Sequence, residues 1–226
     1  MSVSNRLLKI AGMIKHGSSV ADIGTDHAYL PVFLVKEGIA QKAFACDIGD
    51  GPLKNARDNI ERFGIKNVFL RKGDGLSAVK PCEIDTAVIA GMGGDLIARI
   101  IDNAPWIKDA AYELILQPMT AAEELREYLL TNGFDIVLER AVSSQGRIYT
   151  VMKARFVGGS LKCSPLFLYI GRLSENMGED ELSYIKRKRR IIETLASDIG
   201  ELPEQVERYE MLCGVVKEID EILGKL

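Results

Sequence analysis

The sequence is poor in the residues that build metal sites and disulfide frameworks. Its 226 residues include two histidines and only four cysteines, which are far apart: Cys46, Cys82, Cys163 and Cys213. No CxxC pair and no Cys/His cluster occurs, so neither a zinc site nor a disulfide scaffold is indicated. We therefore expect a reduced protein without a metal.

Long apolar runs are also absent. No stretch of about 18 apolar residues occurs, which argues against a membrane-spanning helix, and the amphipathic N-terminus lacks the basic-then-apolar order of a secretory signal. Hydrophobic residues make up 47% of the chain and charged residues 27%, so disorder is excluded as well. We expect a soluble, cytoplasmic protein that does not contact membranes, and nothing in the sequence demands more than a monomer.

An excess of positive charge is lacking too. The 29 Lys and Arg residues are outnumbered by 32 Asp and Glu residues, for a net charge of −3. This excludes a uniformly basic nucleic-acid-binding surface. The exception is residues 186–190, all Lys or Arg, within a C-terminal segment that is otherwise rich in acidic residues. Any contact with nucleic acid would therefore be local.

What the first 155 residues do contain is an alternation of apolar runs and amphipathic patterns. The apolar runs predict strands at 19–23, 42–48, 67–71, 85–90 and 112–116. The amphipathic patterns predict helices at 4–15, 28–38, 51–63, 93–103 and 121–132. This alternation is typical of a parallel sheet with helices on both faces. Two further runs, 134–142 and 147–155, flank a Ser-Ser-Gln-Gly turn and predict an antiparallel hairpin. The predicted fold class is α/β, a mixed doubly wound sheet.

A different pattern follows residue 156, where Gly158-Gly159-Ser160 interrupts the alternation. We therefore expect two domains, 1–155 and 156–226. In the second, apolar residues recur at steps of three and four, which predicts an antiparallel helical hairpin with a coiled-coil seam. Arg189 falls on this seam and is expected to extend its charged end to solvent. The seam of the second helix is predicted to consist of Val206, Tyr209, Cys213, Val216, Ile219 and Leu223.

The turn after the first predicted strand, Asp22-Ile23-Gly24-Thr25-Asp26-His27-Ala28, indicates which ligand the sheet binds. Ligands of a doubly wound sheet bind beyond the carboxyl ends of its strands. Because this turn has one glycine and two carboxylates where a phosphate would lie, it argues against NAD, FAD and ATP. An acidic turn suits S-adenosylmethionine, which carries an ammonium and a sulfonium. Asp26 would lie near the methionine end of that cofactor, or it could simply cap the following helix.

Two more acidic residues end the next two strands. Asp47, followed by Ile48, is predicted to accept both ribose hydroxyls of an adenosyl group. Asp74 could accept from the adenine amino group, with Gly75 leaving room for the ring. The alternatives are a solvated loop aspartate and a simple turn signal. His27 could steer cofactor or substrate, or it could be hydrogen-bonded locally. Acids at the ends of three successive strands together favour an adenosyl cofactor.

The segments after the fourth and fifth strands are candidates for the reaction site. Glycines in Ala90-Gly91-Met92-Gly93-Gly94 permit close backbone approach, or they serve packing alone. Gln117 could hydrogen-bond a base edge, with Pro118 beside it as a further candidate for substrate contact, or Gln117 could cap a helix that begins at Pro118. In the hairpin, Arg147 and Tyr149 could contact substrate, although a strand tyrosine is often half-buried packing.

Four motifs together, ADIGTDHAYLP, GDGL, IAGMGG and LILQPM, resemble the bacterial TrmK family. The resemblance covers roughly residues 1–155, and the helical tail is more loosely similar to that family's coiled-coil domain. It implies a Rossmann-like class I methyltransferase fold with a seven-strand sheet, S-adenosylmethionine as donor, N1 of adenine 22 in tRNA as acceptor, and Asp26 as catalytic residue. We expect cofactor contacts from Asp22, Gly24, Asp26, His27, Asp47, Ile48, Asp74, Gly75, Ala90, Gly91 and Met92.

Adenine N1 lies on the Watson–Crick edge, so a paired or stacked adenine must be extruded before it can react. This requires contacts with RNA beyond the pocket, and Lys186, Lys188 and Arg190 are the candidates for binding phosphates. The alternative is a solvated helical face, balanced by acids such as Glu179 and Glu193. Two other functions are open: a methyltransferase of the same fold acting on another RNA or a small molecule, and a cofactor-sensing RNA-binding protein without catalysis.

Overall fold

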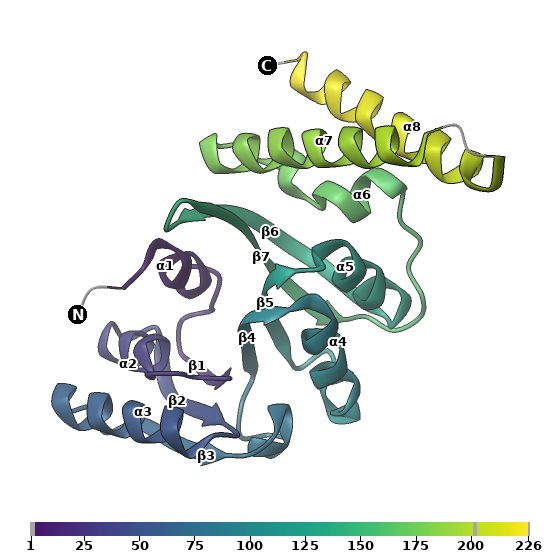
Figure 1. Ribbon diagram of the computed structural model, residues 1–226. Helices are drawn as coiled ribbons and strands as arrows, with labels where there is room; N and C mark the ends of the chain where they lie inside the picture. The colour runs from purple at the N-terminus through teal and green to yellow at the C-terminus, as the bar shows by residue number, and fades with distance from the viewer. Residues whose placement is uncertain (1–2, 201–202, 226) are drawn as a thin grey trace.

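The computed structural model describes residues 3–200 and 203–225, which form a layered α/β unit with a helical tail (Figure 1). Its strands are β1 (Ser18–Ile23), β2 (Ala40–Asp47), β3 (Val68–Lys72), β4 (Thr86–Gly93), β5 (Glu113–Thr120), β6 (Phe134–Ser144) and β7 (Arg147–Phe156). They form one seven-stranded sheet in the order β3-β2-β1-β4-β5-β7-β6. β7 is antiparallel to both of its neighbours, whereas the pairings among β1 to β5 are parallel. The predicted mixed doubly wound sheet is confirmed.

Helices cover both faces of the sheet because the central strands are apolar on both sides. On one face lie α1 (Asn5–Ala11), α2 (Tyr29–Lys36) and α3 (Asp50–Phe63), and on the other lie α4 (Gly94–Asp102) and α5 (Ala122–Thr131). In β1, Val20 packs with α1 and α2, whereas its neighbour Ala21 packs in the cluster that contains α4 and α5. Short 3-10 turns, η1 (Gly75–Ala78) and η2 (Pro105–Ile107), complete this part of the chain. Burial on both faces is typical of a parallel sheet.

The opening helix is shorter than predicted. α1 begins after Ser4, whose hydroxyl accepts from the Leu7 N–H, and it ends at Ala11, before Gly12. Met13 and Ile14 are buried in the segment that leads to β1. Their apolar character reflects this burial rather than a longer helix.

The parallel pairing brings the carboxyl ends of β1 to β5 to one edge of the sheet. Asp22 of β1 pairs with Ala45 of β2 on one side and with Val88 of β4 on the other. The chain leaves β1 toward β2, whereas β4 lies on the opposite side, so the winding direction reverses between β1 and β4. Ligands of such sheets bind at this reversal point.

The tail consists of α6 (Pro165–Ile170), η3 (Leu173–Glu175), α7 (Glu179–Ile199), η4 (Pro203–Gln205) and α8 (Val206–Leu223). The predicted helical hairpin is confirmed, and α7 and α8 lie against each other (Figure 1). The predicted seam of α8 is confirmed in part. Ile219 is buried, and Tyr209, Val216 and Leu223 pack against the same cluster, but Cys213 and Val206 are exposed, and Leu212 and Val215 are buried instead. This difference follows from the packing of α8 against α6 as well as α7.

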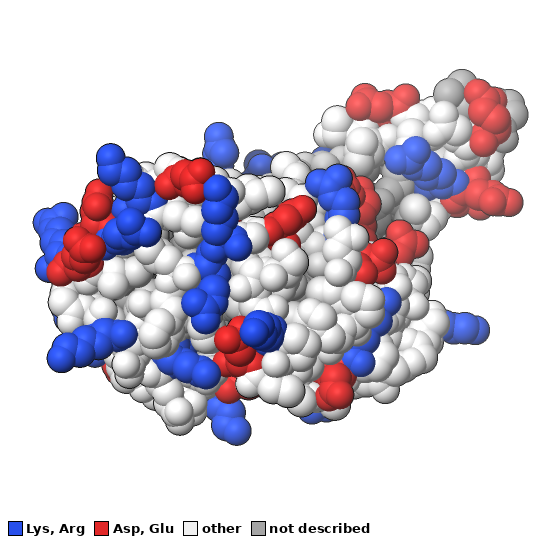
Figure 2. Space-filling view, turned by 90° about the horizontal axis from the view of Figure 1, so that it is seen from below, with Lys and Arg blue, Asp and Glu red and all other residues white. Residues whose placement is uncertain are grey.

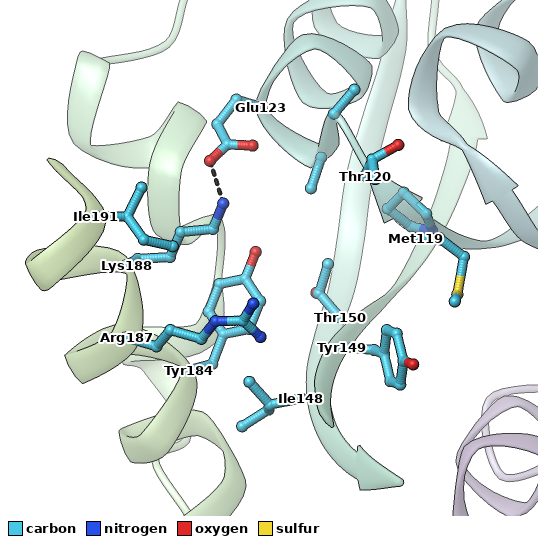
Figure 3. Close-up of a pocket in the computed structure, with 13 residues that line it drawn as sticks. Met119, Thr120, Glu123, Ile148, Tyr149, Thr150, Tyr184, Arg187, Lys188 and Ile191 are labelled. Atoms are coloured by element: carbon cyan, nitrogen blue, oxygen red, sulfur yellow. Dashed lines mark hydrogen bonds and ion pairs between the residues drawn. The ribbon is translucent and has the colours of Figure 1, made fainter. Parts of the chain in front are cut away.

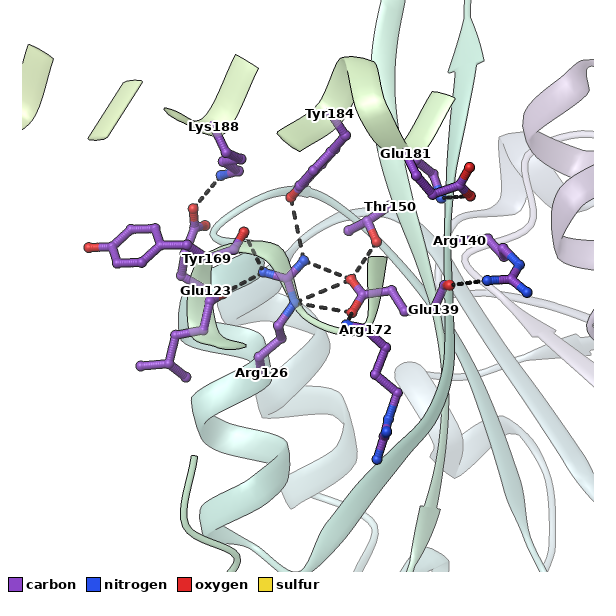
Figure 4. A network of polar contacts seen from close by, with 12 residues as sticks. Glu123, Arg126, Glu139, Arg140, Thr150, Tyr169, Arg172, Glu181, Tyr184 and Lys188 are labelled. Carbon is purple, nitrogen blue, oxygen red and sulfur yellow. Dashed lines mark hydrogen bonds and ion pairs between the residues drawn. The ribbon is translucent and has the colours of Figure 1, made fainter. Parts of the chain in front are cut away.

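A buried ion pair fixes the tail to the sheet. Arg126 of α5 and Glu139 of β6 have fully buried side chains, with Nη2 of the arginine 2.7 Å from Oε1 of the glutamate. Glu139 also accepts from the Thr150 hydroxyl at 2.5 Å and from the Arg172 N–H at 3.1 Å. Arg126 in turn donates to the carbonyl of Leu168 in α6 at 2.5 Å. Figure 4 shows this network between α5, the hairpin strands and the tail.

The exposed edge of the sheet is protected by the start of α7. The Ala141 N–H of β6 donates to the Glu181 carboxylate at 3.0 Å, and the Ser143 hydroxyl donates to Asp180 at 2.5 Å. The Glu181 contact thus removes one of the backbone donors that an edge strand would offer to another strand. β7 ends at Phe156, beside the proposed domain boundary, and the division into two domains stays a prediction.

Candidate functional site

A cavity of about 460 Å³ lies at the carboxyl ends of β1 and β4, at the reversal point of the sheet. Small-molecule sites commonly measure about 300–1,000 Å³. Segments far apart in the chain line it, namely the start of α1, the turn after β1, Ala90 of β4 and the tip of the β6–β7 hairpin. The end of β1, the turn after it and the start of α2 contribute Asp22, Gly24, Thr25, Asp26, His27, Ala28, Tyr29 and Leu30.

The backbone of this turn requires its glycine. Gly24 has a φ of +78°, and a Cβ at this position would overlap the methyl group of Met92. The N–H groups of Gly24 and Thr25 both donate to the carbonyl of Cys46 at 2.9 Å, which ties the turn to β2. These two hydrogen bonds fix the turn at the carboxyl end of β1.

Asp26 projects from this turn with a side chain that is 74% exposed. It does not cap α2, because the residue at the N-cap is Ala28, in a left-handed conformation, and no side chain makes a capping hydrogen bond there. The capping alternative is therefore wrong. Oδ2 of Asp26 lies 3.2 Å from Nε2 of His27, whose ring stacks on Tyr29 with centroids 5.3 Å apart. His27 thus makes a local contact with Asp26, one of the two roles expected for it, and it also lines the cavity.

Asp22 is the buried acid of the site. Burial raises the pKa of its carboxyl to about 6, the Thr25 hydrogen bond and the Arg6 charge lower it, and Asp47 raises it. A carboxyl that titrates near neutrality in a cavity is a feature of functional sites. Its ionised form can accept hydrogen bonds from a cationic or polar ligand.

Asp47 and Asp74 follow along the same edge, at the ends of β2 and β3. Oδ1 of Asp47 accepts from the Gly49 N–H at 2.7 Å, a local turn that leaves Oδ2 without a partner among the described residues. The side chain of Ile48 beside it is 65% exposed, and Gly75, after Asp74, has a φ of +55°. These residues lie outside the lining of the cavity, and their cofactor contacts stay predictions.

The ends of β4 and β5 are joined by a buried amide. β4 carries a register irregularity around Gly91, whose φ is +80°. Oε1 of the buried Gln117 accepts from the Gly91 N–H at 3.2 Å, and its Nε2 donates to the Pro118 carbonyl at 2.8 Å. β5 continues to Thr120, so no helix begins at Pro118, and the idea that Gln117 caps one is wrong. Contact of Gln117 or Pro118 with a base stays a prediction.

The glycines after Met92 have different roles. A Cβ at Gly94 would overlap the carbonyl of Ala121, and one at Gly93 would lie 3.2 Å from the Thr120 hydroxyl. These two glycines therefore allow the β4–α4 and β5–α5 turns to pack together. Gly91 is exposed and faces Arg6 instead, so close approach of a ligand is possible there.

Arg6 is a site residue that the sequence did not reveal. Its Nη1 donates to Oε1 of Gln117 at 2.6 Å, and its charge acts on Asp22. It lies on α1, where an arginine between apolar positions predicts only a solvated face. The hairpin tip contributes a second unpredicted residue, Gln145.

The basic run of the tail is partly neutralised. Lys188 forms an ion pair with Glu123 (Figure 3). Arg189 does not extend freely to solvent but donates to both carboxylate oxygens of Asp220 in α8, at 2.5 and 2.9 Å. The remaining three, Lys186, Arg187 and Arg190, are exposed and have no ion pair within the described residues.

Arg187 borders a smaller cavity of about 100 Å³ between α7, β7 and the β5–α5 turn. Figure 3 shows Arg187 and Tyr149 on opposite walls of this cavity. Tyr149 is also partly buried against the core, which agrees with the packing role that the sequence allowed for it. Arg147 is exposed at the start of β7. On the face in Figure 2, Lys and Arg are interspersed with Asp and Glu, so this face is not uniformly basic.

The part of the chain that the structure describes has neither a metal-binding cluster nor a membrane-spanning helix. No group of three or more His, Cys, Asp or Glu side chains between residues 3 and 225, apart from 201–202, is placed to hold a metal ion. In the same part of the chain, no helix has the length and apolarity needed to cross a membrane.

The doubly wound sheet, the acidic turn after β1 and the acids that end β2 and β3 define a Rossmann-like methyltransferase. A family model described as a methyltransferase domain matches residues 3–152. The tRNA (adenine(22)-N(1))-methyltransferase of Bacillus subtilis is 38% identical over 155 residues, which cover 68% of this chain and 65% of that enzyme. This match thus spans just under two-thirds of the relative's length.

Solved structures match over nearly the whole chain. A Streptococcus pneumoniae protein described as a proposed tRNA (m1A22) methyltransferase has a TM-score of 0.84 and 31% identity, covering 98% of this chain and 100% of that one. M. capricolum TrmK, solved with S-adenosylhomocysteine, has a TM-score of 0.81 and 27% identity with the same coverage. The chain belongs to the TrmK family of methyltransferases.

Proposed function

We propose that this chain transfers the methyl group of S-adenosylmethionine to N1 of adenine 22 in tRNA, giving 1-methyladenine. The observation that carries the proposal is the exposed Asp26 carboxylate in the cavity at the carboxyl ends of β1 and β4, where it caps no helix. The similarity to the B. subtilis enzyme and to M. capricolum TrmK supports the acceptor and the cofactor.

The residues at this edge fit an adenosyl cofactor. Gly24 keeps the turn after β1 free of a side chain, and Asp22 offers a buried carboxylate to a cation. Asp47 has a free oxygen for the ribose hydroxyls, and Asp74 and the exposed Ile48 lie where the adenine would bind. His27, Gly75 and the Ala90-Gly91-Met92 segment complete the proposed contacts. When bound, S-adenosylmethionine supplies a methyl group on a positively charged sulfur.

Asp26 acts on the charge that methylation creates. Adenine N1 has a free lone pair at neutral pH, so the nucleophile needs no strong base to form it. Alignment of N1 with the methyl group supplies much of the rate. Methylation leaves the adenine cationic unless its amino group loses a proton. The Asp26 carboxylate can stabilise that positive charge or accept the proton, and the His27 contact holds the carboxylate in place.

The tail supplies contacts with the RNA beyond the reacting base. The unpaired Lys186 and Arg190 extend from α7 as phosphate ligands, and Arg187 joins them across the smaller cavity from Tyr149. Lys188 is paired with Glu123, so its proposed role is to hold α7 in position rather than to bind phosphate. Arg147, exposed at the start of β7, lies on the substrate side of the site. We infer that the enzyme acts as a monomer in the cytoplasm.

A methyl-transfer assay on paired transcripts tests the proposal. Purified protein is incubated with methyl-labelled S-adenosylmethionine and a tRNA transcript that has adenine at position 22. The control transcript is identical except for guanine at that position. We expect label in the adenine transcript alone, and nuclease digestion followed by dephosphorylation should release it as 1-methyladenosine.

Two other outcomes contradict the proposal in different ways. Equal label in both transcripts, or label at another position, would show a methyltransferase with a different acceptor. No label in either transcript, with cofactor binding measured by calorimetry, would leave the cofactor site standing and favour a sensing protein.

A further inference from the structure

The β6–β7 hairpin extends past the sheet on the side where the cavity lies. β5 pairs with β7 over Glu113–Leu116 and Met152–Arg155, whereas β6 and β7 stay paired as far as Ser144 and Arg147. Because β7 runs antiparallel to β5, its unpaired start points toward the carboxyl edge. The hairpin tip therefore overhangs the site, and Figure 1 shows it next to α1.

Gln145 is the residue at this tip. It lines the same cavity as Asp26 and Arg6, although it comes from the opposite side of the site. Its side chain is exposed, and its amide makes no hydrogen bond to the described residues. A free amide at the rim of a cavity presents one acceptor and two donor hydrogens to whatever enters.

The turn itself does not account for a glutamine. Gln145 and Gly146 have φ values of +52° and +73°, the pattern of a two-residue hairpin turn in which both central residues are left-handed. Such turns favour Asn-Gly or Asp-Gly, because asparagine and aspartate tolerate positive φ best among non-glycine residues. A glutamine here carries a conformational cost, which a role in the cavity explains.

Building on the proposed function, we propose that Gln145 binds the Hoogsteen edge of the target adenine. That edge presents N7 as an acceptor and the N6 amino group as a donor, a pair that a glutamine amide matches with its own donor and acceptor. Binding there leaves N1 open to the methyl group. The second amino hydrogen, on the N1 side, remains for Asp26.

The same contact distinguishes adenine from guanine. Guanine presents two acceptors on this edge, N7 and O6, so the Gln145 carbonyl oxygen would face O6 without a hydrogen between them. Gln145 is thus a specificity-determining residue for the reaction.

The test combines Gln145→Ala with a transcript that carries 7-deazaadenine at position 22, in which N7 is replaced by CH. We expect the alanine variant to lower kcat/KM on adenine roughly 10- to 100-fold, as removal of a bidentate hydrogen bond to a base should. The 7-deaza transcript should cost the wild type roughly 10-fold and cost the variant almost nothing, because the variant has no amide to bind N7. Losses that multiply independently would overturn the proposal.

Gln145→Asn separates the base contact from the turn. Asparagine suits the left-handed position better, so the melting temperature should stay level or rise, while the shorter side chain should lower kcat/KM about as much as alanine does. Full activity of the asparagine variant would contradict the proposal. Gln41→Ala, an exposed glutamine at the start of β2, is the matched control.

Cofactor affinity, measured by calorimetry, shows whether Gln145 contacts the base or the cofactor. The account predicts the same affinity for wild type and Gln145→Ala. A weaker affinity in the variant would assign Gln145 to the cofactor and overturn its role in base recognition. Methylation of the adenine transcript by the wild type checks the proposed function in the same assay, so the two failures are distinguishable.

Discussion

Nη1 of Arg6 donates a 2.6 Å hydrogen bond to Oε1 of Gln117, a residue 111 positions further along the chain. The same oxygen accepts from the Gly91 N–H, so one buried amide joins α1, β4 and β5 at the site. Arg6 also lowers the pKa of Asp22 by its charge. The first helix is therefore a wall of the cavity and part of its electrostatics.

Arg6→Met should loosen this wall. It leaves a buried amide oxygen with one donor fewer, which should lower the free energy of unfolding by about 1–2 kcal/mol, and it should weaken cofactor binding. Urea denaturation and calorimetry measure the two effects. Lys9→Met, on the same helix and without an ion pair within the described residues, is the control. Unchanged values for Arg6→Met would remove the helix from the site.

The buried Arg126–Glu139 pair predicts strong coupling between the sheet and the tail. Burial works against the charge of Arg126, but Glu139 offsets this and holds the pKa of the guanidinium above its ordinary value. Arg126→Met should lower the free energy of unfolding by about 3–5 kcal/mol, because it leaves Glu139 as an uncompensated buried charge. Combining it with Glu139→Leu should restore part of the loss. A double-mutant cycle in urea measures the coupling, and additive losses would argue against it.

Asp22 should make stability depend on pH in one direction. Its pKa rises from 3.8 to about 6 on folding, so between these values the folded state binds more protons than the unfolded state. The free energy of unfolding should therefore fall by about 2–3 kcal/mol as the pH rises from 4 to 7.

Asp22→Asn isolates this contribution. The free energy of unfolding of the wild type minus that of the variant should decrease, or become negative, as the pH rises from 4 to 7. Urea denaturation at several pH values measures this difference. A difference that stays constant from pH 4 to pH 7 would show that Asp22 titrates normally.

Reversing the charge of Lys186, Arg187 and Arg190 to glutamate should weaken tRNA binding. The dependence of log affinity on log salt concentration should become shallower by roughly 0.7–0.9 for each phosphate that the variant no longer binds. The same change at Lys54, Arg57 and Lys66, exposed on and just after α3, should have a smaller effect. Filter binding at several salt concentrations measures both, and equal slopes for the wild type and the tail variant would exclude this surface.

Most of the fold could be predicted because its signals are local. Strands buried on both faces read as continuous apolar runs, and the acids that follow them mark strand ends. The predicted strand at 85–90 ends too early, since β4 runs to Gly93. Glycines rarely indicate a strand, and here they continue one through a backbone irregularity.

The site was harder to predict wherever it depends on contacts between distant segments. Arg6 and Gln145 look like surface residues in their own segments, and only the folded chain brings both beside Asp26. The seam of α8 was predicted only in part, for a similar reason. Its buried face depends on α6 as well as α7, and periodicity along one helix does not show which neighbours will cover it.

The single-turnover rate of Asp26→Asn tests the central claim most directly. With cofactor and tRNA saturating, the account predicts a rate of methyl transfer to adenine 22 that is roughly 10²-fold or more below the wild type, because the carboxylate acts on charge that develops in the reaction. Cofactor affinity, measured by calorimetry, should change only modestly. A variant that transfers the methyl group at the wild-type rate would contradict the account.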